Sequence, residues 1–211
     1  MYQPPHFREE RLDVQHALIR AHPLGLLVSI GEDGPLANAI PFLLDATSSP
    51  KGTLRAHLAR ANPQWRALAG DGRALVVFQG AQTYVTPSWY ATKRETGKVV
   101  PTWNYAIVQA HGTARTIEDR DWLAQHVASL TGQNEASRMQ PWAVDDAPPA
   151  FIEAQLKGIV GIEIEITRIE GKWKVSQNRP ENDRAGVAEG LEADRDSQGA
   201  SAMAQMVRRG G

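Results

Sequence analysis

The sequence has no cysteine among its 211 residues. This absence excludes disulfide bonds, thiolate nucleophiles, cysteine-ligated zinc and dithiol redox chemistry. No stretch approaches the roughly 20 apolar residues that a helix needs to cross a bilayer, and the first ten residues lack the apolar run of a signal peptide. We therefore expect a cytoplasmic protein that makes no membrane contact.

An excess of charge of one sign is also lacking, because 23 basic residues stand against 24 acidic ones and the formal net charge is -1. Such a balance gives no overall attraction to nucleic acid or to an anionic membrane. The sequence shows no helix-turn-helix pair with a basic second helix and no basic stripe outside the short Arg208-Arg209 end. Direct binding to nucleic acid is therefore not supported.

Catalytic and metal-binding motifs are missing as well. The six histidines show no metal-ligand spacing, and there is no P-loop, dinucleotide fingerprint or nucleophile elbow. Glu163 and Glu165 could form a carboxylate pair, but they alternate with isoleucines, which favours a solvated strand face. We assign no catalytic residue and no metal ligand.

What is present is a run of short apolar segments with strand character. Strands are expected at residues 24–30, 36–44, 53–58, 73–78, 83–86, 102–116 (with a possible interruption at Gly112), 162–167 and 172–177. Helices are expected at residues 12–22, 62–68, 118–130 and 149–156, and a charged loop at residues 93–98. Helices and strands do not alternate regularly, so the pattern predicts a mainly β, antiparallel barrel or sandwich with peripheral helices rather than a doubly wound parallel sheet.

The length fits one domain with a substantial core and some trailing sequence. From Arg184 onward the composition shifts to small and charged residues with few large apolar ones. We expect a single domain at residues 1–191 and a weakly packed or disordered tail at residues 192–211.

A first group of polar residues lies where the third expected strand runs into a helix start. Backbone N–H groups at such a point, together with the imidazole of His57 and the guanidinium of Arg60, would form a phosphate cradle. An ordinary loop with Asn62 as a helix cap and a surface arginine explains the same residues equally well.

Aromatic and polar side chains then alternate between residues 84 and 105. One group contains Tyr84, Ser88, Trp89 and Lys93, and the next contains Thr102, Trp103 and Asn104. A planar heteroaromatic ligand would suit such a wall, since its rings stack there while hydroxyls and amides meet its polar edge. Core or interface aromatics with locally bonded polar tips are the alternative.

A last group, with Gln177 and Arg179, follows the final expected strand. An amide and a guanidinium there could meet a ligand. The succession Asn-Arg-Pro is also a common way to leave a strand and start a helix at Pro180.

Five motifs occur in order between Met1 and about Leu191. They are Met1-Tyr2-x-Pro-Pro-x-Phe7, His57-x-Ala-Arg60-x-Asn62-Pro63-x-Trp65, Tyr84-x-x-Pro87-Ser88-Trp89-Tyr90, Val100-Pro101-Thr102-Trp103-Asn104-Tyr105 and Ser176-Gln177-Asn178-Arg179. In this succession the chain resembles the PaiB family, which is described as FMN-binding negative transcriptional regulators.

The resemblance implies the FMN-binding split β-barrel, a fold shared with pyridoxamine-phosphate oxidases and flavin reductases. It implies a homodimer in which each flavin lies in the groove between the two subunits. It places the FMN phosphate and ribityl chain at His57, Arg60 and Asn62, and the isoalloxazine at Thr102, Trp103 and Asn104, with Tyr84, Ser88, Trp89, Lys93, Gln177 and Arg179 as further cofactor-binding residues. Split-barrel oxidases generally offer a lysine or serine near the phosphate, and an arginine fork suits a phosphate at least as well.

Three functions remain open at this point. The protein is a flavin-binding transcriptional regulator that acts indirectly, or an FMN-dependent oxidoreductase of the flavin reductase or pyridoxamine-phosphate oxidase type. A haem-binding member of the fold would need an axial ligand such as His57 or His111, and their spacing does not favour it.

Overall fold

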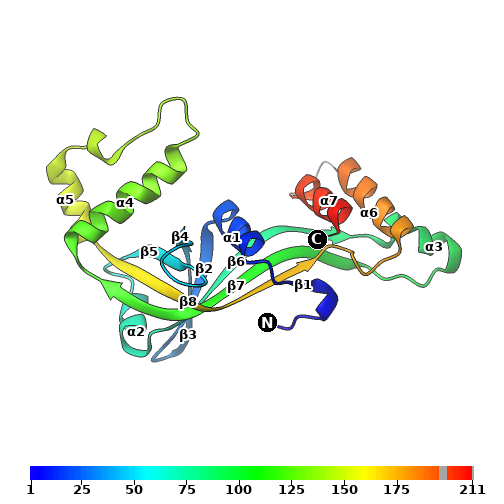
Figure 1. Cartoon of the computed structure of the whole chain (residues 1–211), viewed down its shortest axis with the longest axis horizontal. Coiled ribbons are helices and arrows are strands. Elements are labelled where there is room, and N and C mark those ends of the chain that lie inside the picture. The colour runs from blue at the N-terminus through cyan, green and yellow to red at the C-terminus, as the bar shows by residue number, and fades with distance from the viewer. Residues whose placement is uncertain (195–198, 211) are drawn as a thin grey trace. The chain divides into compact units, whose positions relative to one another are not determined.

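The structure is a computed structural model that describes residues 1–194 and 199–210, with the backbone alone at Asp71. Its strands are β1 (Arg8–Glu9), β2 (Leu24–Gly31), β3 (Gly34–Pro41), β4 (Leu43–Asp45), β5 (Thr53–Ala59), β6 (Arg73–Val85), β7 (Thr102–Ile117) and β8 (Ile159–Lys174) (Figure 1). Its helices are α1 (Leu12–Ala21), α2 (Gln64–Asp71), α3 (Ala91–Thr96), α4 (Arg120–Glu135), α5 (Pro149–Lys157), α6 (Glu181–Ala193) and α7 (Ala200–Arg209). Short 3₁₀ turns lie at Pro5–Phe7, Pro87–Trp89 and Val144–Asp146. Among the described residues, no helix has the length and apolar character needed to cross a membrane.

The strands form one sheet in the order β3-β2-β6-β7-β8-β5-β4, and β1 pairs with β8 outside this order. The pairs β1–β8, β2–β3, β2–β6, β4–β5 and β5–β8 are antiparallel. The β2–β3 hairpin closes at Gly31 and Gly34, and Gly34 has a φ of 115°, which favours glycine. These features confirm the predicted mainly β, antiparallel fold with peripheral helices.

The chain divides into two compact units. Unit 1 contains Met1–His22, Phe78–Gln109 and Glu170–Gly211, and unit 2 contains Pro23–Val77 and Ala110–Ile169. Because β6, β7 and β8 each have residues in both units, we retain a single domain over residues 1–191 as a prediction.

The core of unit 2 follows the alternation seen in the sequence. Ile162, Ile164 and Ile166 of β8 are at most 3% exposed, which confirms the predicted buried face. The predicted interruption at Gly112 does not occur, because β7 is continuous there. A Cβ at Gly112 would lie 2.1 Å from the carbonyl oxygen of Glu165, so glycine permits the close approach of β7 and β8.

Three local predictions were wrong. Part of the expected charged loop at residues 93–98 is helical, since α3 runs to Thr96 and ends at Gly97, which has a φ of 70°. The two strands expected at residues 162–167 and 172–177 are not separated by a turn, because β8 continues through residues 168–171 to Lys174 and pairs with β1 at Lys172. The expected strand at residues 36–44 divides into β3 and β4 at the buried Phe42.

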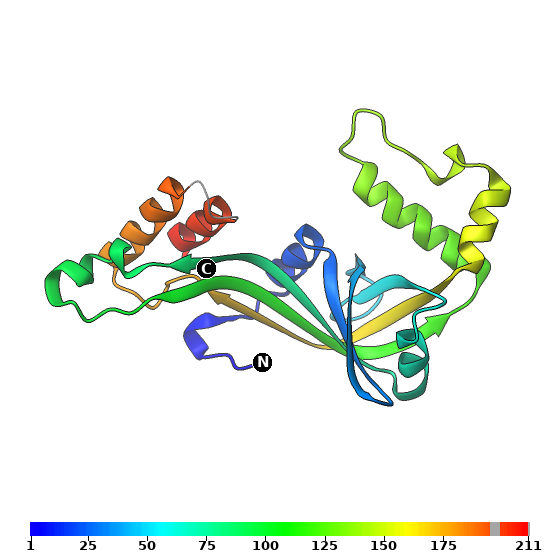
Figure 2. The ribbon, with the colours of Figure 1, turned by 180° about the vertical axis from the view of Figure 1, so that it is seen from behind.

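Helices α6 and α7 lie side by side in unit 1 (Figures 1 and 2). Part of the expected weakly packed tail, residues 192–211, therefore forms α7, while residues 195–198 and 211 lie outside the described residues. Helical spacing places small and medium side chains on one buried stripe of α7, namely Ala200, Met203, Ala204 and Val207. The expected weak packing rested on the lack of large apolar residues, and small residues such as Ala200 and Ala204 pack in their place.

The outer side of β2 and β3 in unit 2 is apolar. Four residues of β2 pair across the hairpin with four of β3, as Leu24–Pro41, Leu26–Ala39, Val28–Ala37 and Ile30–Pro35. Leu24, Leu26 and Ile30 are 64%, 43% and 56% exposed. Leu75 and Val77 of β6 lie opposite Val28 and Leu26 and extend this surface to a third strand. These ten side chains, named the apolar face below, carry no charge and no hydrogen-bonding group.

Candidate functional site

Two exposed aromatic rings lie together in unit 1. Tyr84 of β6 and Trp103 of β7 meet edge to face with their ring centroids 6.1 Å apart. They are 46% and 55% exposed, although most large aromatic side chains in a folded protein are buried. Exposed rings in mutual contact offer a stacking surface for a flat ligand. We name Tyr84 and Trp103 the aromatic pair.

Buried hydrogen bonds hold the strand that carries Trp103. The amide of Asn104, which is 1% exposed, donates to Oγ of Ser176 over 2.9 Å. Ser176 has a φ of 65°, a left-handed conformation that is uncommon outside glycine and often marks functional sites. Lys174 Nζ donates to Oγ1 of Thr102 and, over 2.6 Å, to the carbonyl oxygen of Trp103. The structure thus joins the predicted group at Thr102, Trp103 and Asn104 to the end of β8.

The group at Gln177 and Arg179 makes local contacts. The Gln177 side chain accepts from the Val175 N–H over 2.8 Å and donates to the Trp173 carbonyl over 2.5 Å, so it closes the end of the strand. The Arg179 guanidinium lies 4.9 Å from the ring centroid of Tyr90, a cation–π contact. Burial raises the pKa of the Tyr90 phenol.

Ser88, Trp89 and Lys93 lie near α3 and α6. Lys93 Nζ donates to Oγ of Ser88 over 3.2 Å. Trp89 packs on α6, where a Cβ at Gly190 would lie 2.4 Å from the indole and a Cβ at Gly186 would lie 2.1 Å from the Trp89 carbonyl oxygen. In unit 1, Trp89 therefore anchors α6.

Two lysines occupy alternate positions at the end of β8. Lys172 is 8% exposed, and its Nζ lies 5.4 Å from the ring centroids of both Tyr2 and Tyr105. Burial, together with the charges of Lys172 and Arg179, lowers the pKa of Lys174. Unit 1 therefore holds positive charge beside its aromatic residues.

A pocket of about 440 Å³ adjoins these side chains. Its lining, named the Lys172 pocket below, consists of Met1, Tyr2, Gln79, Gln82, Trp103, Tyr105, Ile107 and Lys172. The pairing of β1 with β8 and a 3.0 Å ion pair between the Met1 amine and Glu170 bring the first residues to this place. Tyr2, Tyr105 and Lys172 were not among the predicted site residues. The outward alternation of Trp103 and Tyr105 on one strand was the available signal.

In unit 2, His57 contacts a second histidine. Its Nδ1 lies 3.2 Å from Nε2 of His126, and Trp122 stacks on the His126 ring with centroids 5.1 Å apart. Burial lowers the pKa of His57, and burial with the charges of His57 and Arg55 lowers the pKa of His126 to about 4. If His57 were an axial ligand of haem, as the haem alternative requires, binding to the iron would compete with its contact to His126.

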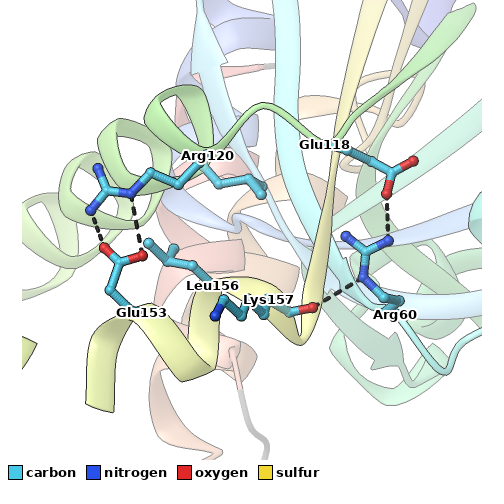
Figure 3. A pocket seen from close by; sticks show the side chains of 7 residues that line it. Arg60, Glu118, Arg120, Glu153, Leu156 and Lys157 are labelled. Carbon is cyan, nitrogen blue, oxygen red and sulfur yellow. Dashed lines mark hydrogen bonds and ion pairs between the residues drawn. The ribbon is translucent and has the colours of Figure 1, made fainter. Parts of the chain in front are cut away.

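Arg60 lines a pocket of about 380 Å³ in unit 2 (Figure 3). Its guanidinium points to Glu118 and donates to the carbonyl oxygens of Lys157 over 3.0 Å and Ile159 over 3.2 Å. Arg120 and Glu153 point toward one another in the same pocket. A phosphate at Arg60 would therefore take the place of the Glu118 carboxylate.

The backbone around Arg60 is also bonded within unit 2. The N–H of Arg60 donates to Gly158 and that of Asn62 donates to Ala59, each over 2.8 Å. Oδ1 of Asn62 accepts from the N–H of Gln64 over 3.0 Å, as a helix cap does. These contacts match the ordinary loop that the sequence left open as an alternative.

The predicted site residues divide between the two units. Unit 2 holds His57, Arg60 and Asn62, and unit 1 holds Tyr84, Ser88, Trp89, Lys93, Thr102, Trp103, Asn104, Gln177 and Arg179. Within unit 1, Tyr84, Thr102, Trp103 and Asn104 come together with Lys174 and Ser176. Across the described residues, no cluster of three or more histidine, aspartate or glutamate side chains could hold a metal ion.

Comparison with known proteins identifies the family. The family described as "Putative FMN-binding domain" matches residues 1–168. The protein AN0679 of Emericella nidulans is 39% identical over 227 residues, which cover 91% of this chain and 90% of that protein. The Bacillus subtilis "Protease synthase and sporulation protein PAI 2" is 31% identical over 207 residues, which cover 98% of this chain and 96% of that protein.

Solved structures show the same fold. The Mycobacterium tuberculosis protein Rv2991 matches with a TM-score of 0.60 at 15% identity, over 85% of this chain and 94% of that chain. The predicted split-barrel fold and the predicted FMN cofactor are thereby confirmed. This chain belongs to the PaiB family of FMN-binding split-barrel proteins.

Proposed function

We propose that the protein binds FMN with the isoalloxazine ring against the aromatic pair. The observation that carries this proposal is the edge-to-face contact of Tyr84 and Trp103, both of them about half exposed. The buried bond between Asn104 and Ser176 keeps the Trp103 strand in place, so the stacking surface is rigid before a ligand arrives.

The chemistry of the surrounding groups fits FMN. The aromatic pair suits the flat ring system. Positive charge from Lys172, Lys174 and Arg179 suits a ring system that becomes more electron-rich on reduction. When bound, FMN supplies the electron chemistry, and these residues hold and orient it.

His57, Arg60 and Asn62 remain our proposed site for the phosphate and ribityl chain. Two carbonyl oxygens already orient the Arg60 guanidinium, so a phosphate there would meet a donor that is held in place. The free energy gained when a phosphate binds Arg60 is reduced by the loss of the bond between Arg60 and Glu118.

We also propose a homodimer with flavin sites at the subunit interface. The apolar face supports this, since a two-fold contact needs a surface that complements itself, and a face without charge meets its own copy without repulsion. Strands of about 3.3 Å per residue, about 4.8 Å apart, give this face on the order of 350 Å². That is close to half of the roughly 800 Å² that each partner buries in a standard interface, the remainder being rim.

The PaiB family is described as negative transcriptional regulators. In this protein such a role would be indirect, and the protein would act in the cytoplasm. Several surface arginines support indirect action, because each of these is bonded to a carboxylate that a DNA phosphate would have to displace. Such pairs are Arg60–Glu118, Arg115–Glu163, Arg120–Glu153 and Arg208–Glu192. The second candidate is an FMN-dependent oxidoreductase, favoured by the position of Lys172 and Lys174 near the aromatic residues.

Flavin titration tests the proposal. Purified protein should quench FMN fluorescence with saturation at one FMN per chain, and failure to bind FMN at micromolar concentrations would overturn it. Steady oxidation of reduced nicotinamide by the loaded protein would select the oxidoreductase. Salt-sensitive binding to a promoter fragment would contradict indirect action.

A further inference from the structure

Lys172 is a buried ammonium group that faces a pocket. It is 8% exposed and lines a space of about 440 Å³. Its contacts with ring systems are those to Tyr2 and Tyr105, and within residues 1–194 and 199–210 it forms no ion pair with a carboxylate. Burial of an unpaired charge costs stability, which cation–π contacts offset only in part. A ligand that brings a negative charge to Lys172 would remove that cost.

The rest of the lining limits what this ligand can be. Tyr2, Trp103 and Tyr105 place aromatic rings around the pocket, which favours a planar ligand. Gln79 donates from Nε2 to Oε1 of Gln82 over 2.5 Å, which leaves Oε1 of Gln79 as an acceptor and Nε2 of Gln82 as a donor for the edge of a ligand. No carboxylate is among the lining residues, so an anion would meet no repulsion from them.

The number and shape of the positive groups in the pocket favour a carboxylate over a phosphate. Phosphate sites usually combine several cations or backbone N–H groups at a helix start. Here the Met1 amine is already paired with Glu170, so the pocket offers the single charge of Lys172. One compact ammonium matches one carboxylate.

We propose that the Lys172 pocket binds a planar aromatic carboxylate of one or two rings as a second ligand beside FMN. This rests on the proposed flavin position, because Trp103 belongs both to the aromatic pair and to the lining of the pocket. The second ligand would share Trp103 with the cofactor. The pocket volume is in the range of small-molecule sites.

Titration of the FMN-loaded protein with 2-naphthoate tests the proposal, with changes in the flavin absorbance spectrum as the readout. The wild type should bind 2-naphthoate, and Lys172→Met should weaken it at least tenfold. Lys98→Met is the matched control, because Lys98 is an exposed lysine of unit 1 outside the pocket, and should leave the affinity unchanged. The neutral 2-naphthamide should bind the wild type at least tenfold more weakly than 2-naphthoate. That comparison needs no variant, so it decides the question even if Lys172→Met does not fold.

The outcomes separate the two proposals. FMN binding without 2-naphthoate binding, or equal binding of 2-naphthoate by wild type and Lys172→Met, would overturn the second ligand and leave the proposed function intact. Competition between 2-naphthoate and FMN would also overturn it, because the pocket would then be the seat of the flavin ring. Failure of FMN to bind would overturn the proposed function. Tryptophan fluorescence of the flavin-free protein would then show whether the pocket takes the anion.

Discussion

His57 and His126 are joined by a contact between ring nitrogens, with Nδ1 of His57 and Nε2 of His126 3.2 Å apart. One ring must donate and the other accept, so the hydrogen bond needs at least one neutral imidazole. Trp122 stacks on His126, and Arg55 adds positive charge nearby. Burial and the charge of Arg55 therefore disfavour an imidazolium at His126.

Stability should therefore fall in mild acid. The pKa of His126 is about 4 in the fold against an ordinary 6.5, so the unfolded chain binds more protons between these values and unfolding becomes easier as the pH falls through this window. We expect a loss of about 2 kcal/mol between pH 7.5 and pH 4.5 from this residue. Urea unfolding at both pH values measures it. His126→Gln should show a correspondingly smaller loss, and equal losses in both proteins would contradict the assignment.

Arg60→Ala should weaken FMN binding by roughly 1.5 to 3 kcal/mol, the scale of a charged hydrogen bond. Arg120→Ala is the control, since Arg120 lines the same pocket but pairs with Glu153. Glu118→Gln should strengthen FMN binding by removing the carboxylate that competes for Arg60. Fluorescence titration gives all three affinities, and an unchanged value for Arg60→Ala would remove Arg60 from the site.

Trp103→Leu should reduce FMN affinity by about 1 to 3 kcal/mol, the range of aromatic stacking on a heterocyclic base. Trp142 is a comparably exposed tryptophan of unit 2, at 46% against 55%. Trp142→Leu should therefore leave the affinity as it is. Similar affinities for the two variants would show that the flavin ring does not use the aromatic pair.

Gly190→Ala should destabilise the protein by about 1 to 3 kcal/mol, because overpacking displaces neighbouring groups. The new methyl would lie 2.4 Å from the Trp89 indole. Gly132→Ala in α4 has open space around it and should stabilise the protein by about 0.5 to 1 kcal/mol through helix propensity. Denaturant melts that place both variants on the same side of the wild type would argue against the packing of Trp89 on α6.

Leu26→Glu should convert the proposed dimer into a monomer, because a two-fold contact would bring two buried carboxylates onto the apolar face. Phe151→Glu is the control, since Phe151 is also a large exposed side chain, 55% against 43%, but lies outside that face. Light scattering over a range of concentrations measures the mass. A wild type that is monomeric throughout would exclude the dimer.

Local patterns in the sequence were sufficient for much of the fold. The alternation of Ile162, Ile164 and Ile166 with polar residues predicts one buried strand face, and these side chains are buried. The glycines around residues 31–34 predict the β2–β3 hairpin, which forms there. Each of these signals spans only a few residues, because the alternation of side chains along a strand and the preference of glycine for turns are local properties of the chain.

The site could be predicted only in part, since it joins segments that lie far apart in the chain. Trp103 and Tyr84 stood out because aromatic and polar residues alternate around them. Lys172 was expected only as the first residue of a strand, and its burial arises from Tyr2 and from the pairing with Arg8, more than 160 residues earlier in the chain. A contact of that separation leaves no local pattern.

The apolar face also lies at a sheet margin, because β3 is the last strand in the order and carries Pro35 and Pro41 near its two ends. Proline has no N–H to offer a further strand, so backbone pairing along this margin is interrupted at both positions. Copies of the chain can meet through side chains there, while the two prolines interrupt any continuation of one another's sheet. At high concentration the protein should therefore form particles of finite size rather than cross-β fibres.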